Sequence, residues 1–257
     1  KIYKNIEAWR NRPVEGEYPY VFLDGIVLKR TWAGEVRNVS VLAAIGVGTD
    51  GYRKVLGIAE GAKEDKSGWS AFLKHLKERG LKGVKLFISD ACTGLVDSIA
   101  EHYPEVAWQR CAVHFYRNVF SLVPKSKVRE VARMLKAIHA CEDRHAAVAK
   151  AQAVVAKLRA IKLPKAAELV QDAVNDTLAY YGFPSQHWRS IRTNNPLERI
   201  LREIRRRTRV VGAFPDGNAA LMPCAARLRH IAGTRWGTKR YLSMEPLNQP
   251  SQEMTAA

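Results

Sequence analysis

The chain has 257 residues, of which 42 are Lys or Arg and 25 are Asp or Glu, so its formal net charge at pH 7 is +17. Hydrophobic residues make up 47% of the chain, which supports a folded core and excludes a disordered tail. A charge this far from zero in a folded protein favours a polyanionic partner, and nucleic acid ahead of a membrane surface. Charge alone leaves open a basic protein that binds no polyanion.

The cysteines, Cys92, Cys111, Cys141 and Cys224, are scattered and form no Cys-x-x-Cys pair. This usage is typical of free thiols in a reducing compartment. No apolar run approaches the roughly 20 residues that cross a bilayer, and no signal peptide is visible. We therefore expect a soluble intracellular protein without a membrane partner. Because the chain begins at Lys1 rather than Met, we also expect further sequence upstream.

Strand-like and helix-like runs alternate in the first half of the chain, after a polar segment, residues 1–17, that we interpret as a linker. The expected fold class is α/β, with a mixed five-stranded sheet flanked by helices. The patterns predict three antiparallel strands at 18–30, 37–47 and 54–58, then a helix at 68–79 capped by Ser67, a strand at 84–90, a helix at 95–102 and a fifth strand at 106–110. The ribonuclease H-like fold has this order of elements, with acids on its first and fourth strands.

The second half of the chain is predicted to be helical. Between residues 124 and 187 apolar residues recur at helical spacing between proline breaks, which indicates an all-α insertion. Two helices follow: one has Asn195 as its cap and Pro196 at its first position and runs to Arg209, and the other covers residues 218–231. We thus expect a linker at 1–17, one α/β domain in two parts, 18–123 and 188–245, the insertion at 124–187, and a disordered tail at 246–257.

Three acids occupy positions that suggest metal binding. Asp24 interrupts an apolar strand, where a lone charge is costly unless it is paired or bound to metal. Asp90 ends another apolar strand, and Glu198 stands where a basic helix begins. Two acids on adjacent strands and one on a helix suit a pair of Mg²⁺ ions, because hard cations take oxygen ligands. The alternative is that Asp90 caps the next element and that Glu198 closes a capping box with Asn195.

Two ions held by shared carboxylates would activate an oxygen nucleophile and stabilise the leaving oxygen of a phosphodiester. The protein itself would supply no nucleophile. The corresponding reaction class is phosphoryl transfer on nucleic acid, by hydrolysis or by attack of a 3′ hydroxyl group, with positioning as the main contribution of the protein.

The helix after Glu198 is strongly basic. Its arginines repel one another unless phosphates intervene, because only Glu203 offsets them, so we favour a DNA-facing helix over a merely solvated one. These arginines are Arg199, Arg202, Arg205, Arg206, Arg207 and Arg209. Trp188 is a candidate for stacking on an unpaired base, although core packing is the commoner role of a tryptophan.

Cys111 and His114 have the spacing of half a zinc site, but the sequence holds no second half with matching spacing. We therefore favour a buried thiol and an imidazole that support the metal-binding acids from beneath.

Four motifs are distinctive in combination: Gln109-Arg110-Cys111-Ala112-Val113-His114-Phe115-Tyr116-Arg117-Asn118, Asn195-Pro196-Leu197-Glu198-Arg199, Arg205-Arg206-Arg207-Thr208-Arg209-Val210-Val211-Gly212 and Phe214-Pro215. Together they resemble the mutator-type transposases of bacterial insertion sequences, and the similarity extends from about Tyr18 to Met244. The sequence departs from the family pattern at Cys92 and Thr93, where histidine and lysine are frequent, and at Leu201, where asparagine is usual.

The resemblance implies a ribonuclease H-like Asp-Asp-Glu catalytic domain with an all-helical insertion between the second Asp and the Glu. Carried onto this sequence, the catalytic and metal-binding residues are Asp24, Asp90 and Glu198, and the Cys-x-x-His signature falls on Cys111 and His114. The implied activity is cleavage of double-stranded DNA at transposon ends and strand transfer into target DNA, with two Mg²⁺ ions for which Mn²⁺ can substitute. The implied state is a homodimer or higher oligomer on DNA, in the bacterial cytoplasm at the nucleoid.

Two other functions remain open. One is a hydrolytic nuclease or resolvase on the same fold, and the other is a catalytically inactive, transposase-derived DNA-binding protein. The intact set of three acids counts against the second. The resemblance also implies an N-terminal helical DNA-binding region, which we expect to lie outside this chain.

Overall fold

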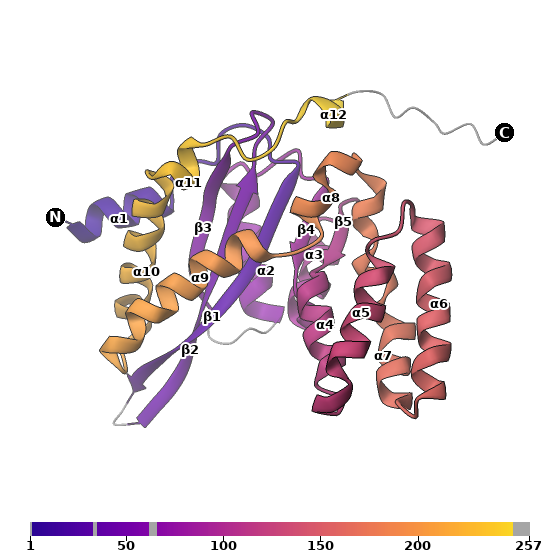
Figure 1. Ribbon diagram of the computed structural model, residues 1–257. Coiled ribbons are helices and arrows are strands. Elements are labelled where there is room, and N and C mark those ends of the chain that lie inside the picture. Colours follow the sequence, from indigo (N-terminus) through magenta and orange to yellow (C-terminus); the bar gives the residue numbers. More distant parts are fainter. Residues whose placement is uncertain (1, 33–34, 62–65, 249–257) are drawn as a thin grey trace.

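A five-stranded mixed sheet organises the residues described by this computed structural model, which are 2–32, 35–61 and 66–248 (Figure 1). The strand order is β3-β2-β1-β4-β5. Strand β1 pairs antiparallel with β2, and β2 antiparallel with β3, whereas β4 lies parallel to both β1 and β5. The predicted α/β class and mixed sheet are confirmed. The strands are β1 (Tyr20–Trp32), β2 (Glu35–Val47), β3 (Arg53–Gly61), β4 (Leu86–Ser89) and β5 (Ala107–Arg110).

The turn between β2 and β3 is formed as the sequence predicts. Gly51 has a φ of +80°, a conformation that glycine adopts without strain, and Asp50 Oδ1 accepts a hydrogen bond from the Tyr52 backbone N–H at 2.9 Å. A Cβ atom at Gly51 would lie 2.1 Å from the Leu242 carbonyl oxygen. The turn therefore needs glycine both for its backbone and for the close approach of the C-terminal segment.

Helices cover both faces of the sheet. Alternate side chains of β1 point to opposite faces, so apolar residues on both sides are buried against helices. On one face, Val21 and Leu23 pack with apolar residues of α2 (Lys66–Glu78) and α3 (Thr93–His102). On the other face, Tyr20 and Phe22 belong to a larger core that includes the helices of the second half of the chain. The predicted cap at Ser67 is wrong: this residue lies inside α2, which begins one residue earlier.

The remaining elements are mostly helical. They are α1 (Ile2–Arg10), α4 (Ala112–Phe120), α5 (Val128–Ile138), α6 (Arg144–Ala160), α7 (Pro164–Ala173), α8 (Ser185–Ile191), α9 (Asn195–Thr208), α10 (Gly217–Ala232), α11 (Arg235–Thr238) and α12 (Glu245–Asn248), with short 3₁₀ turns η1 (Lys125–Lys127), η2 (Asn175–Thr177), η3 (Ala179–Gly182) and η4 (Arg209–Val211). None of the helices in the described ranges has the length and apolar character needed to span a membrane.

The N-terminal segment is not the linker that we predicted, because residues 2–10 form α1. Ile6 is buried and Trp9 packs against the core, and α1 contacts α10. This helix has only 9 residues, so its apolar positions repeat too few times to give a clear helical pattern in the sequence. At the other end, α12 occupies the start of the predicted tail, and residues 249–257 lie outside the described residues.

The predicted helical character of residues 124–187 is confirmed. Leu135 of α5, Leu158 of α6 and Val170 of α7 are fully buried, and Figure 1 shows these helices side by side next to α4. Gln109 of β5 joins this layer to the sheet: its Nε2 donates to the Thr177 carbonyl at 2.8 Å, and its Oε1 accepts from the Tyr180 N–H at 2.8 Å. Since Gln109 is fully buried, the sheet edge and the helical layer are held by paired polar groups.

His139 at the end of α5 is a buried neutral imidazole. Tyr116 Oη lies 2.7 Å from its Nδ1, and Thr177 Oγ1 lies 2.8 Å from its Nε2. Because the Thr177 hydroxyl donates to the Val174 carbonyl, it accepts from Nε2–H, and Nδ1 accepts from Tyr116. Burial lowers the pKa of His139 from 6.5 to about 4.

We predict that His139 makes the protein acid-sensitive. Its pKa is lower in the folded state, so the unfolded chain binds the proton first, and stability is lost as the pH falls from 6.5 towards about 4. This group should account for about 3 kcal/mol of the loss. Urea unfolding across this pH range should show a shallower pH dependence for His139→Gln, which stays neutral. The exposed His145→Gln control should match the parent, and an equal slope in His139→Gln would contradict the assignment.

Candidate active site

The two aspartates lie side by side because of the strand register. Strands β1 and β4 are parallel, with Phe22 opposite Ile88. Asp24 lies two residues after Phe22 and Asp90 two residues after Ile88, so the two aspartates lie next to each other on the same face of the sheet. Adjacent strands are about 4.8 Å apart, which places the two carboxyl groups within strong electrostatic reach.

Asp24 is held in an environment that disfavours its charge. Burial, then the nearby charge of Asp90, raise its pKa to about 7, with a smaller contribution from Glu198. The Gly25 backbone N–H, which donates to Asp24 Oδ1 at 2.8 Å, and His114 act in the opposite direction. Neither Asp24 nor Asp90 forms an ion pair with any cationic side chain that the structure describes. A bound cation would relieve the repulsion between them.

Helix α9 brings Glu198 to the same place. The helix is anchored at its start by Asn194, which is fully buried and whose Nδ2 donates to the Leu23 carbonyl of β1 at 2.8 Å. The Asn194 backbone N–H points at the sulfur of Cys111, 3.1 Å away. The predicted cap at Asn195 is wrong, because this residue is already helical and Asn194 precedes the helix. Pro196 lies in the first turn, as predicted.

The Glu198 side chain turns towards α4 rather than back onto its own helix. Its Oε1 accepts from His114 Nε2 at 2.8 Å and from Arg117 Nη1 at 3.0 Å, and Arg202 Nη2 lies 3.9 Å from Oε2. The contacts with His114 and then Arg117 lower the pKa of Glu198 to about 2, and burial opposes them. The alternative of a capping box is thereby contradicted, since the N-cap makes no side-chain capping bond and Glu198 is engaged elsewhere.

His114 is a cation at neutral pH. Cys111, then Glu198, raise its pKa to about 10, and burial opposes them. Glu198 is hydrogen-bonded to Nε2 of His114, whereas Nδ1 makes no hydrogen bond within the described residues. His114 and Arg117 therefore fix the ionised Glu198 carboxylate in place.

The three acids line one hollow of about 430 Å³. Leu201 adds a buried apolar side chain to the wall of this hollow. Asparagine is usual at this position in the family that the sequence resembles. The remaining charged residues around the acids are all cationic: His114, Arg117, Arg202 and Arg205. The arrangement combines carboxylates for cations with basic groups for phosphate.

The donor set fits the predicted metal. Three carboxylates supply oxygen ligands, and two of them carry no competing ion pair with the described side chains. Among the described residues, the grouping whose donor atoms all lie within 4.8 Å of one another is a different one, Cys111, His114 and Glu198. It offers three groups where structural zinc sites use four, and His114 is already hydrogen-bonded to Glu198. We therefore interpret Cys111 and His114 as support for Glu198, as the sequence predicts.

Comparison with known proteins identifies the family. A family model described as "Transposase, Mutator family" matches residues 1–232. The chain belongs to the Mutator family of transposases. Curated relatives include the transposase for insertion sequence IS1081 of Mycobacterium tuberculosis, 41% identical over 252 residues, which are 98% of this chain and 60% of that protein.

Two further curated relatives are similar to the chain. The transposase for ISRM5 of Rhizobium meliloti is 34% identical over 97% of this chain and 62% of its own length. The transposase for IS256 in transposon Tn4001 of Staphylococcus aureus is 34% identical over 84% of this chain and 55% of its own length. The chain thus spans little more than half the length of such relatives.

The arginines of α9 in this Mutator-family chain divide into three groups. Arg202 and Arg205 line the hollow with the acids. Arg206 and Arg207 pair with Glu203, at 3.1 Å and 2.6 Å. Arg199 points to the other side of the helix, and Arg209 lies beyond it in η4. The helix therefore does not present one uniform basic face.

Trp188 is engaged in packing, the alternative that we weighed against base stacking. Its indole N–H donates to the Phe183 carbonyl at 2.6 Å, and its ring meets Tyr180 and Tyr181 edge-on. It lines neither the acid hollow nor the larger hollow described below.

Sequence reasoning did not single out Arg117 and Asn194 as contributors to the site. Arg117 could have been found, since it lies one helical turn after His114 and so shares its face. Asn194 gave no signal, because its partner is 171 positions away.

We predict that Asn194→Ala destabilises the protein by about 1–2 kcal/mol, because the buried hydrogen bond between α9 and β1 is lost. Urea unfolding measures the change. Asn195→Ala, at the less buried neighbouring position, is the matched control and should change the free energy of unfolding by less than about 0.5 kcal/mol. Equal effects in the two variants would show that the bond to Leu23 contributes little.

Proposed function

We propose that this chain carries the ribonuclease H-like catalytic domain of a transposase that cleaves DNA at transposon ends and transfers the cut strand into target DNA. The observation that carries the proposal is the meeting of Asp24, Asp90 and Glu198 around one hollow, from positions far apart in the sequence. The strand order, with acids at β1 and just after β4, and the helical residues between Asp90 and Glu198 support the fold assignment.

Asp24, Asp90 and Glu198 would hold two Mg²⁺ ions, or Mn²⁺ in their place. When bound, the ions would supply activation of an attacking oxygen and charge stabilisation at the leaving oxygen of a phosphodiester. The residues of the chain position the reactants: His114 and Arg117 fix the Glu198 carboxylate, and Cys111 packs behind them. Arg202 and Arg205 would attract the DNA backbone to the hollow.

The partner is double-stranded DNA, as transposon end and as target, and we expect a homodimer or higher oligomer on it, at the bacterial nucleoid. Because the relatives are longer than this chain, recognition of particular end sequences is not assigned to it.

We predict that Asp24→Asn abolishes both cleavage and joining. Losing one metal-binding carboxylate removes several kcal/mol of transition-state stabilisation, which corresponds to a loss of about a thousandfold or more. DNA affinity should stay the same or rise, since a negative charge near phosphate is removed. Cleavage is measured on uncut transposon ends and joining on pre-cut ends, each with Mg²⁺ or Mn²⁺, and DNA binding is measured alongside.

Asp97→Asn is the matched control, because Asp97 is an exposed acid on α3, and it should retain the parent rate. Joined products from the parent protein support the transposase, nicking alone indicates a nuclease or resolvase, and binding without cleavage indicates an inactive DNA-binding protein. If Asp24→Asn joined ends at the parent rate, Asp24 would not be a metal ligand.

A further inference from the structure

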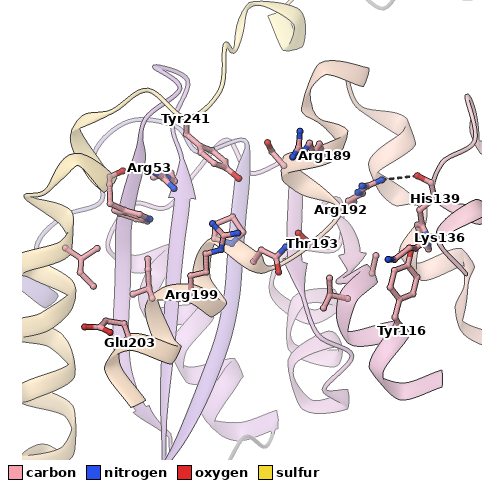
Figure 2. A pocket seen from close by; sticks show the side chains of 18 of the residues that line it. Arg53, Tyr116, Lys136, His139, Arg189, Arg192, Thr193, Arg199, Glu203 and Tyr241 are labelled. Atoms are coloured by element: carbon pink, nitrogen blue, oxygen red, sulfur yellow. Dashed lines mark hydrogen bonds between the residues drawn. The ribbon is translucent and has the colours of Figure 1, made fainter. Parts of the chain in front are cut away.

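A second and larger hollow, of about 900 Å³, lies on the other side of the first turn of α9. Figure 2 shows its residues converging from two sides. Lys136, Tyr116 and Arg192 lie on the side of the helical layer, and Arg53 and Tyr241 lie on the side of β3 and the C-terminal segment, with Arg199 between them. Residues of β3, α4, α5, α8, α9, α10, α11 and the C-terminal segment build this hollow, so no single stretch of sequence could have indicated it.

The hollow is strongly cationic. Six basic side chains line it against one acid, Glu203, and that acid is already bonded to Arg206 and Arg207 outside the hollow and lies 3.5 Å from Arg227. The six are Arg53, Lys136, Arg189, Arg192, Arg199 and Arg227. Lys136, Arg189 and Arg199 are exposed and form no ion pair in the described part of the chain. Cations gathered in this way repel one another until an anion enters.

The cations come with aromatic surfaces. Tyr116, Trp236 and Tyr241 line the same hollow. The Arg53 guanidinium lies 4.8 Å from the ring centre of Trp236 and 4.5 Å from that of Tyr241, and its Nη2 donates to the Trp236 carbonyl at 2.8 Å. Arg53 thus holds the two rings in place. Basic groups beside fixed rings suit a ligand with both phosphates and flat bases.

This hollow and the acid hollow share two walls. On α9, Glu198 lines the acid hollow, whereas Asn195 and Arg199 line the larger hollow. On α4, His114 and Arg117 face the acids, whereas Tyr116 faces the larger hollow. A helix with its side chains is about 10–12 Å across, so a strand that crosses α9 from the acid hollow reaches the larger hollow within a few nucleotides.

We propose that the larger hollow binds single-stranded DNA, a few nucleotides from the phosphate at the acids, on the strand being cut or joined. Its phosphates contact Lys136, Arg189 and Arg199, and its unpaired bases lie against Tyr116 and Tyr241. The proposal rests on the proposed function for the position of the scissile phosphate. A duplex fits less well, because its bases are stacked internally and cannot reach the rings.

The test compares two triple variants that each lose three positive charges. The pocket variant is Lys136→Gln/Arg189→Gln/Arg199→Gln. The control is Arg133→Gln/Lys150→Gln/Lys165→Gln, whose targets are exposed residues of the helical layer outside the hollow, and Arg133 shares α5 with Lys136. Binding is measured by fluorescence anisotropy in EDTA, where no metal-dependent reaction proceeds. The probes are a labelled oligodeoxythymidine of about 12 nucleotides and the same strand in a duplex.

The pocket variant should bind the single strand at least about tenfold more weakly than the control, and the slope of log affinity against log salt should fall by about 2, at about 0.7 per phosphate contact. Duplex binding should fall equally in the two variants. Equal weakening of single-strand binding in the two variants would overturn the proposal. So would competition by thymidine monophosphate as effective, per nucleotide, as the unlabelled strand, since that would indicate a mononucleotide site.

Thermal unfolding shows whether both variants are folded. Should the triple variant be unfolded, the pair Lys136→Gln/Arg189→Gln, both exposed, replaces it, with an expected fall in slope of about 1.4. Cleavage by the parent is measured separately with Mg²⁺. If the parent protein binds the single strand through the hollow but does not cleave DNA, the proposed function is refuted and the strand site is not. If the parent protein cleaves DNA and the pocket variant binds the single strand as tightly as the control variant does, only the strand site is refuted.

Discussion

Repulsion between neighbouring carboxylates is the constraint on which the rest of the structure depends. The parallel register of β1 and β4 fixes Asp24 and Asp90 close to each other, and burial strengthens the repulsion between their carboxylates. The fold compensates the negative charges of the three carboxylates unequally. It gives Glu198 three cationic partners, His114, Arg117 and Arg202, and gives the aspartates none among the described side chains, so the unpaired negative charge is concentrated at the sheet.

Much of the sheet and of the acid site could be predicted from the sequence, because both depend on local patterns. The apolar runs that end near Asp24 and Asp90 indicated adjacent strands, and the proline at position 196 indicated the helix that carries Glu198. Local pattern failed where a side chain has a distant partner. Asn195 has the sequence signature of a cap, but Asn194 precedes the helix and uses its amide to reach β1.

The same limit explains what the sequence could not reveal about charge. Six arginines in one helical stretch look like one basic face, yet Glu203 pairs with two of them and the helix divides three others between opposite sides. Which residues oppose each arginine is set by the packing of α9 against β1 and α10. Arg53 and Tyr241, far apart in the sequence, meet beside Gly51, where the C-terminal segment approaches closely.

The angular setting of α9 about its own axis has an evolutionary consequence. Successive residues of a helix are about 100° apart, so a one-residue insertion or deletion between Asn194 and Glu198 would turn every following side chain to a new direction. Arg199 or Leu197 would then face the aspartates, and the carboxylate would be lost from them. The length of this stretch is therefore constrained separately from its composition: an in-frame insertion or deletion of one residue would leave the composition of the helix almost unchanged and still turn the Glu198 carboxylate away from the aspartates.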